Sequence, residues 1–260
     1  MGIRLENARN LYLEGIRDGD ASAAIERYAG ERYEQHSTGV PTGKDGFVEF
    51  FTEFLARHPD RHIEIHRGFE DGRYVFLHAS QVLDGGAAKW VTADIFDTDD
   101  EGRMVEHWDI IQELADDTVS GRSMVEGPAE PTDLHLTEQN KAFVGRFVEE
   151  VLVGGDVGRA GEFVSGETYL QHNPQVADGL DGLAEAMAVM AAAGQAMVYR
   201  TVHRLIGCGD LVVTLSEMSM GETDMAVIDI FRVAGGRIVE HWDVMEPIPT
   251  PEVARNSGKF

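Results

Sequence analysis

The string Val-Glu-His-Trp-Asp occurs twice in this chain, at residues 105–109 and again at residues 239–243. Each copy follows an Asp-Ile-Phe string and a turn that contains Gly-Arg. A five-residue match that includes tryptophan rarely arises by chance, and a repeat at this spacing is typical of a duplicated domain. The chain is therefore constrained to fold as two similar domains, each carrying the same pattern of polar residues.

The duplication extends over nearly the whole of each copy. Gly-Asp at 19–20 and Tyr-x-Gln-His at 33–36 recur in the same order at 155–156 and 169–172. Each copy has the size of an ordinary domain. The repeat therefore indicates a tandem pair of domains and not a solenoid of short units.

The segment between the copies is rich in Asp, Gly, Ser and Pro and has no periodic apolar pattern, which is typical of a linker. We expect a first domain at 1–114, a linker at 115–137 and a second domain at 138–250. Such a linker would allow the copies to form an internal pseudo-dimer, with Trp108 and Trp242 near the contact. Packing within each copy and, less favoured, stacking on a ligand are the other interpretations of these tryptophans. Assembly into a homo-oligomer stays open.

Charge and composition argue against several classes of function. The net charge of −24, with only four lysines, argues against nucleic-acid binding, which needs basic patches. The single Cys208 excludes an internal disulfide and a cysteine-based zinc cluster. No apolar run is long enough to span a membrane, and the first residues lack the apolar core of a secretory signal. We expect a cytoplasmic protein that acts on a small, neutral or weakly polar molecule.

Each copy is predicted to place helices first and strands last. Apolar residues at helical spacing open both copies, and a short second helix follows Asp20 or Asp156, each an expected N-cap. A third helix is expected to begin near Gly46 or Gly182. Alternating patterns then predict strands at 62–70, 73–82, 88–97 and 104–112, and at 197–206, 210–218, 225–233 and 237–245. The predicted class is α+β, with helices packed on one side of a curved antiparallel sheet.

Alternation along the last strand places His107 and Asp109 on one face of the sheet, and likewise His241 and Asp243. A hairpin brings Asp94, or Asp229 in copy two, close to these residues. If the helices cover that face, burial raises the carboxyl pKa values because a charged carboxylate loses hydration. A carboxyl of raised pKa can take a proton from a carbon acid and return it.

Two other interpretations of these residues stay open. A buried Asp-His pair can be a hydrogen-bonded brace between the sheet and its helices. His107 and Asp109 with His36 could also form a metal site of two histidines and one carboxylate. Such spacing is common by chance, so we predict no metal and no cofactor. The sequence has no serine-nucleophile elbow, no P-loop and no dinucleotide motif.

The motifs of copy two, Tyr-Leu-Gln-His-Asn-Pro at 169–174 and Ile-Val-Glu-His-Trp-Asp at 238–243, resemble those of the SnoaL-like polyketide cyclase family. This family belongs to the nuclear transport factor 2-like superfamily of cone-shaped α+β domains. The resemblance covers 138–248 and, more loosely, 5–114, where Ser37 and Thr38 replace Asn-Pro. It implies a cone-shaped, cystatin-like α+β barrel in each copy.

The resemblance also implies chemistry. Well-studied family members close a ring by intramolecular aldol reaction without a cofactor, using an acid/base aspartate that matches Asp109 and Asp243. The neighbouring strand residue is often histidine in the cyclases and is aspartate here. We expect His107 and His241 to orient the carboxylate or polarise the oxygen, and His36 and His172 to donate to the developing enolate. A plain capping role for His36 and His172 is the other interpretation. The candidate site residues are Asp243, His241, Asp229 and His172 in copy two and Asp109, His107, Asp94 and His36 in copy one.

The preferred hypothesis is a cofactor-independent acid/base enzyme, namely an aldol cyclase, isomerase or lyase, that acts on a small and mostly apolar carbonyl compound. Copy two is the better candidate for activity, because its motifs match the family more closely. The alternative is a non-catalytic small-molecule-binding or assembly protein on the same fold.

Overall fold

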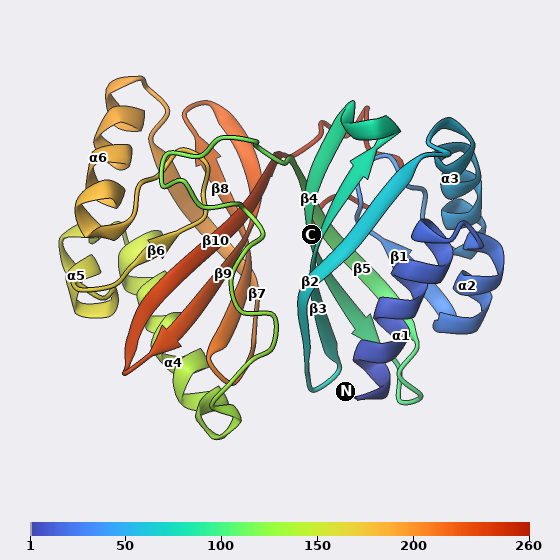
Figure 1. Cartoon of the computed structure of the whole chain (residues 1–260), viewed down its shortest axis with the longest axis horizontal. Coiled ribbons are helices and arrows are strands. Elements are labelled where there is room, and N and C mark those ends of the chain that lie inside the picture. Colours follow the sequence, from blue (N-terminus) through green and yellow to red (C-terminus); the bar gives the residue numbers. More distant parts are fainter. Residues whose placement is uncertain (1) are drawn as a thin grey trace. The chain divides into compact units, whose positions relative to one another are not determined.

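The structure of the chain is a computed structural model that describes residues 2–260 (Figure 1). The chain forms two compact units. Of the described residues, unit one comprises 2–114 together with 249–260, and unit two comprises 115–248. The segment predicted to be a linker, 115–137, thus lies with unit two, and the residues after the last strand of copy two lie with unit one.

Unit one begins with helix α1 (Ile3–Tyr12), which runs into a π-helical turn at Leu13–Arg17. The other helices are α2 (Ala21–Tyr28) and α3 (Lys44–Arg57), and a 3₁₀ turn occupies Asp84–Gly86. The strands are β1 (Ala29–Gln35), β2 (Arg61–Asp71), β3 (Tyr74–Leu83), β4 (Ala88–Thr98) and β5 (Met104–Glu113). They form one sheet in the order β1-β5-β4-β3-β2.

Unit two repeats this plan with a shorter second helix and a shorter first strand. Its helical segments are a 3₁₀ turn (Leu134–Leu136), α4 (Thr137–Phe147), a π-helical turn (Val148–Val153), a second 3₁₀ turn (Val157–Arg159), α5 (Ala160–Phe163) and α6 (Gly179–Ala192). Its strands are β6 (Leu170–Gln171), β7 (Met197–Cys208), β8 (Leu211–Met220), β9 (Thr223–Ala234) and β10 (Arg237–Pro247). The sheet order is β6-β10-β9-β8-β7.

Each sheet is mixed, which corrects the prediction of a purely antiparallel sheet. β1 pairs with β5 in parallel, and β6 pairs with β10 in parallel. Neither short strand was predicted, because their polar, non-alternating residues give no strand pattern. The parallel pairing places Gln35 opposite His107 and Gln171 opposite His241.

The two expected helix caps have different outcomes. The Asp20 side chain accepts a hydrogen bond from the Ala23 backbone N–H at 3.3 Å and caps α2, as predicted. Asp156 makes no such side-chain bond, because the chain after it forms a 3₁₀ turn before the short α5. Asp156 thus occupies the expected N-cap position, at the start of the 3₁₀ turn, but does not cap it through its side chain.

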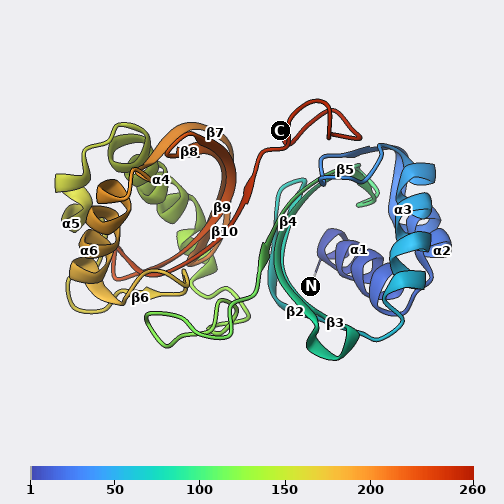
Figure 2. The same cartoon turned by 90° about the horizontal axis from the view of Figure 1, so that it is seen from above.

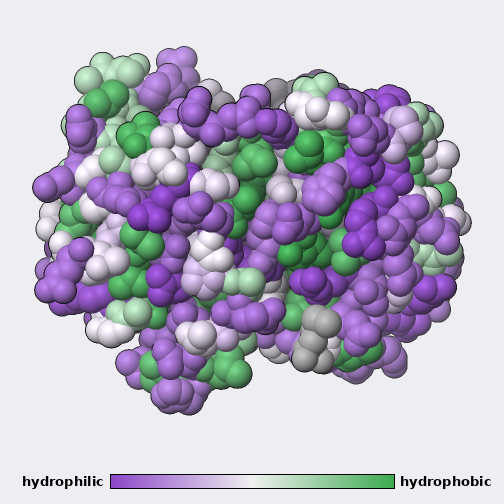
Figure 3. All heavy atoms as spheres, viewed as in Figure 1, coloured by the Kyte–Doolittle hydropathy of each residue, from purple (hydrophilic) through white to green (hydrophobic). Residues whose placement is uncertain are grey.

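In each unit the helices lie on the concave side of the curved sheet, as Figure 2 shows, so that sheet and helices enclose a core. In unit one Leu11 and Tyr12 of α1 and Phe47 of α3 pack with the buried sheet residues Leu77 and Phe96. The predicted α+β architecture is thereby confirmed. The face seen in Figure 3 is mostly hydrophilic, in keeping with the acidic composition. Among residues 2–260, no helix is long and apolar enough to cross a membrane.

Candidate active site

The predicted acidic residues of each unit lie opposite one another on neighbouring strands. Asp94 of β4 is the register partner of Asp109 of β5, and Asp229 of β9 is the partner of Asp243 of β10. All four side chains are buried. Because paired residues project to the same side of a sheet, each unit holds two carboxyl groups side by side.

This shared face is the one that the helices cover. In unit one the Tyr12 hydroxyl of α1 lies 2.9 Å from the Thr92 hydroxyl, and Thr92 donates to Asp94 at 2.9 Å. The ring of His107 stacks on Phe96, with centroids 4.3 Å apart. The geometry expected from strand alternation therefore holds, since His107 and Asp109 point into the core between sheet and helices.

A glutamine fixes the histidine of unit two. The Gln171 side-chain oxygen accepts hydrogen bonds from the backbone N–H groups of His172 and Asn173, both at 3.0 Å. The same oxygen lies 3.1 Å from Nδ1 of His241. An amide oxygen can only accept hydrogen bonds, so this contact requires a proton on Nδ1 of His241.

The other ring nitrogen of His241 faces a carboxyl. His241 Nε2 lies 3.1 Å from Asp229 Oδ1. With Nδ1 already protonated, one further proton is shared between Nε2 and Asp229, either as imidazolium and carboxylate or as imidazole and carboxylic acid. Burial lowers the pKa of His241, but the hydrogen bond to Asp229 and the charges of Asp243 and Asp229 outweigh it and raise the pKa overall.

Unit one repeats the same chain of contacts. The Gln35 oxygen accepts from the backbone of His36 at 3.0 Å and of Ser37 at 2.9 Å, and it lies 2.9 Å from Nδ1 of His107. His107 Nε2 lies 3.0 Å from Asp94 Oδ1. Burial raises the pKa of Asp94, in opposition to His107. Both units therefore hold one proton between an inward histidine and the aspartate of the preceding strand.

The last-strand aspartates differ between the units. In unit two the Asn173 side-chain amide lies 3.0 and 2.8 Å from the two Asp243 oxygens. Burial is the largest effect and raises the pKa of Asp243, and Asp229 adds to it. The charge of His241 and the hydrogen bond from Asn173 oppose this rise, but the pKa stays above the ordinary value. Asp243 therefore retains a proton to a higher pH than an exposed aspartate does.

In unit one a lysine replaces the asparagine as partner. The Lys259 ammonium donates to Asp109 at 3.3 Å, and both side chains are buried. Burial alone would raise the pKa of Asp109, but Lys259, His107 and the Ser37 hydroxyl together hold it below the ordinary value. Ser37 stands where copy two has Asn173. Asp109 is therefore kept ionised.

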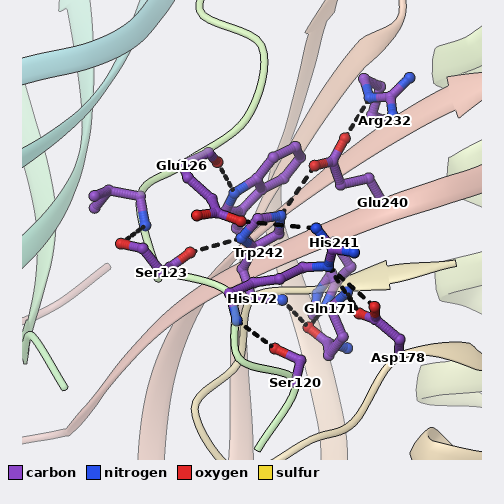
Figure 4. A network of polar contacts seen from close by, with 12 residues as sticks. Ser120, Ser123, Glu126, Gln171, His172, Asp178, Arg232, Glu240, His241 and Trp242 are labelled. Carbon is purple, nitrogen blue, oxygen red and sulfur yellow. Dashed lines mark hydrogen bonds and ion pairs between the residues drawn. The ribbon is translucent and has the colours of Figure 1, made fainter. Parts of the chain in front are cut away.

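His36 and His172 do not lie among the inward residues. His172 stacks on Trp242, with centroids 4.6 Å apart, and its Nε2 lies 2.9 Å from Glu240, which pairs with Arg232 (Figure 4). Glu240 and Trp242 alternate with the inward His241 and Asp243, so they belong to the opposite face of β10.

In unit one His36 stacks on Trp108, with Nε2 3.0 Å from Glu106. The expected role of His36 and His172 as donors to an enolate therefore does not fit. The backbone N–H groups of His36 and His172 still bond to the last strand, so alternation directs their side chains to the face opposite Gln35 and Gln171. The metal set of His36, His107 and Asp109 is not brought together either, because His36 lies with the outward residues.

Three clusters of side chains have the right donors for a metal ion. They are Glu34, His36 and Glu106, then Asp94, His107 and Asp109, then Asp229, His241 and Asp243. In the two inward clusters each imidazole nitrogen already has a glutamine or aspartate partner. A metal ion would have to displace the shared proton, so hydrogen bonds among the residues account for these clusters fully.

A small cavity adjoins the site of unit one. It measures about 30 Å³ and is lined in part by Tyr12, Tyr33, His107 and Asp109. This is the volume of about one water molecule. A larger hollow of about 290 Å³ lies beside α4 and involves none of the candidate site residues.

Comparison of the sequence with models of protein families identifies the family of this chain. The model of the SnoaL-like domain matches the chain twice, over residues 9–107 and 144–241. The chain belongs to the SnoaL-like family. The two matches coincide with the two units, so the predicted tandem of SnoaL-like domains is confirmed. The comparison with curated proteins gave no match.

Solved structures with similar folds carry several activities in their descriptions. A protein assigned as a polyketide cyclase from Bacillus cereus is 21% identical, with TM-score 0.38, over 42% of this chain and 74% of its own. An LEH-like epoxide hydrolase from M. tuberculosis is 18% identical, with TM-score 0.36, over 42% and 83%. A protein assigned as a ketosteroid isomerase from Kribbella flavida is 15% identical, with TM-score 0.36, over 47% and 98%. At these levels the likeness decides nothing about the reaction.

Several partners in the two SnoaL-like sites were missed by the sequence interpretation. Gln35 and Gln171 served only as markers of the repeat, because the strands that hold them, β1 and the two-residue β6, show no alternating pattern. Lys259 lies far from Asp109 in sequence, and no local pattern connects them. Tyr199, which donates to both Asp229 oxygens at 3.0 and 3.1 Å, is an ordinary strand residue by pattern.

Proposed function

We propose that unit two is a cofactor-independent acid/base enzyme that moves a proton at the carbon next to a carbonyl group. The reaction class is an aldol cyclisation, an isomerisation or a lyase reaction on a small and mostly apolar carbonyl compound. The observation that carries the proposal is the Asp243 carboxyl, which is buried, has a raised pKa and lies in register with Asp229. A base for a carbon acid needs a pKa raised toward the working pH.

The proposed roles follow from the contacts. The ionised Asp243 takes the proton from the α-carbon, so that a C–H bond breaks, an O–H bond forms and negative charge develops on the carbonyl oxygen. The proton shared by His241 and Asp229 is the nearest acid to that oxygen. Asn173 orients the Asp243 carboxyl through its amide. The proton on Asp243 then returns to a carbon of the product.

The surroundings favour an apolar substrate. Tyr199, Met218, Met225 and Val227 form a buried cluster in unit two, against which three partly buried methionines pack: Met197, Met220 and Met245. Methionine side chains are unbranched and adapt to irregular apolar shapes. Tyr199 connects this cluster to the acid pair through its hydrogen bond to Asp229.

Solvent deuterium uptake tests the proposal without knowledge of the natural substrate. A panel of cyclic ketones and enones is incubated with the protein in D₂O, and loss of the α-proton signal is followed by NMR. Asp243→Asn is expected to slow the catalysed exchange by about 100-fold or more, since positioned general bases contribute about 10²–10⁴-fold. Asp109→Asn is the matched control at the same strand position and should leave the rate within about twofold.

The non-catalytic alternative has one observation in its favour in unit one. Asp109 there is ionised and neutralised by Lys259, and the adjoining cavity is about 30 Å³. In unit two, exchange that is equally fast in wild type and Asp243→Asn, or that never exceeds the rate without protein over the whole panel, would favour that alternative for both units.

A further inference from the structure

The segment 249–260 contains no helix or strand and reaches the site of unit one. Most of its residues are exposed or partly exposed, whereas Lys259 is buried. The Asn256 side chain donates to the backbone oxygens of Ser37 at 2.7 Å and Val40 at 2.9 Å. The segment is therefore attached through a few side-chain contacts, which is typical of parts that open locally without global unfolding.

The corresponding place in unit two is taken by residues 115–127. His172 Nδ1 donates to the Ser123 backbone oxygen at 2.6 Å, and His36 Nδ1 donates to the Gly258 backbone oxygen at the same distance. The residue that follows Ser123 is Met124, and the residue that follows Gly258 is Lys259. Both are buried. The two segments therefore present an unbranched side chain at equivalent positions, one apolar and one cationic.

The pocket that receives Lys259 has the chemistry of an ammonium site. Asp109 is a buried carboxylate without an asparagine partner, because Ser37 occupies the position of Asn173. The buried Tyr33 hydroxyl lines the adjoining cavity and has no hydrogen-bond partner among residues 2–260. A buried carboxylate and a hydroxyl oxygen beside one cavity can accept N–H bonds from a primary ammonium group.

We propose that the Asp109 pocket of unit one is a binding site for an alkylammonium group, and that Lys259 of the 249–260 segment fills it from within the chain. While Lys259 is bound, the residual cavity of about 30 Å³ is too small for an organic ligand. Release of the segment would open the pocket to an external primary amine with a short apolar chain. The inference concerns unit one and does not depend on the reaction proposed for unit two.

Chemical replacement of the lysine side chain tests the site. Lys259→Ala removes the atoms beyond Cβ, and n-propylammonium supplies the same atoms from solution. The Asp109 carboxyl is followed by ¹³C NMR titration and assigned with Asp109→Asn. The pKa of Asp109 is expected to rise in Lys259→Ala and to fall again when n-propylammonium is added. The variant should bind n-propylammonium at least about tenfold more tightly than Lys259→Ala/Asp109→Asn does.

Two controls define the outcomes. Lys259→Met introduces a methionine, as at Met124 of unit two, so the pocket stays filled by an unbranched side chain. This variant should raise the pKa of Asp109 because the ammonium is lost. It should not gain affinity for n-propylammonium. If Lys259→Ala folds but binds n-propylammonium no better than the double variant, or if the pKa of Asp109 does not respond to it, the proposal is wrong.

A measurement on the wild-type chain removes the dependence on any variant folding. Hydrogen exchange of the backbone amides of residues 256–260 is compared at rising n-propylammonium concentration and at equal tetramethylammonium concentration. Only the primary ammonium can donate N–H bonds to Asp109, so only n-propylammonium is expected to displace Lys259 and to accelerate exchange. Equal exchange in the two salts would overturn the proposal.

Discussion

Asp109 and Asp243 occupy the same position of the repeated Val-Glu-His-Trp-Asp string, yet their pKa values shift in opposite directions. Both lie opposite an aspartate on the preceding strand and next to an inward histidine. The difference comes from the third partner, which is the Lys259 ammonium for Asp109 and the Asn173 amide for Asp243. The duplicated scaffold thus holds one ionised carboxylate and one carboxyl that retains its proton more readily.

This contrast predicts that replacing aspartate by asparagine has opposite effects on stability at Asp243 and at Asp109. An aspartate with a raised folded-state pKa, such as Asp243, contributes stability that is complete below the unfolded pKa of about 3.9 and is lost as pH rises through the folded pKa. Asp243→Asn should therefore stabilise unit two at pH 7 by on the order of 1 kcal/mol. The gain should vanish below pH of about 3.5. Urea unfolding across pH measures both.

Asp109→Asn should act in the other direction. The pKa of Asp109 is lowered, so its contribution is present above the unfolded pKa of about 3.9 and is lost as pH falls through the folded value. At pH 7 the substitution leaves the buried Lys259 ammonium without its carboxylate and should cost about 3 kcal/mol. Unit one would then unfold at lower urea concentration, and a stability gain in this variant would contradict the assigned ion pair.

Gln171→Ala tests the interpretation that one glutamine oxygen holds three donors. The substitution leaves the backbone N–H groups of His172 and Asn173 and the Nδ1–H of His241 without their acceptor. We expect a loss of about 3 kcal/mol in the unfolding free energy of unit two. Gln175→Ala is the control, because that side chain is exposed. Equal stability of the two variants would show that the network does not brace the site.

His172→Ala tests the outward cluster. The variant loses the hydrogen bond to the Ser123 oxygen and the stacking on Trp242. Residues 118–126 should then open more often, by about 1–2 kcal/mol in local opening free energy. Hydrogen exchange at Val119 reports this directly, because its N–H bonds to the Pro174 oxygen at 3.0 Å. Unchanged protection at Val119 would mean that other contacts hold the segment.

Asp20 and Asp156 occupy equivalent positions before the second helix of each unit, and their alanine variants test the difference in capping. Asp20→Ala should destabilise unit one by about 1 kcal/mol, because the Asp20 carboxylate caps α2. Asp156→Ala, at the equivalent position, should have little effect on unit two, since Asp156 makes no capping bond with its side chain. Thermal unfolding of both variants distinguishes them, and an equal loss in the two would contradict the assigned difference.

Much of the fold follows from periodic patterns in the sequence. The eight long strands and helices α1, α3, α4 and α6 carry apolar residues at regular spacing, and each pattern occurs in both copies. The strands β1 and β6 were missed because their residues do not alternate, and β6 has only two. Their parallel pairing, which brings Gln35 to His107 and Gln171 to His241, is a long-range event without a local signal.

The inward orientation of His107, Asp109, His241 and Asp243 was predictable because a strand alternates with period two. The positions of His36 and His172 were not, because their side-chain direction follows from the pairing of β1 and β6 with the last strand, which the sequence did not indicate. Lys259 illustrates a further limit. Its role depends on an irregular segment that reaches the site through tertiary contacts, and no spacing along the chain encodes such a contact.

The central claim is that Asp243 is a buried carboxyl whose pKa is raised enough to serve as a base for carbon acids. A ¹³C titration of selectively labelled aspartates, with Asp243 assigned from the Asp243→Asn spectrum, measures this directly. The account predicts a midpoint for Asp243 clearly above the ordinary aspartate value of about 3.9, with Asp109 below it in the same titration. A midpoint for Asp243 at or below about 3.9 would contradict the account.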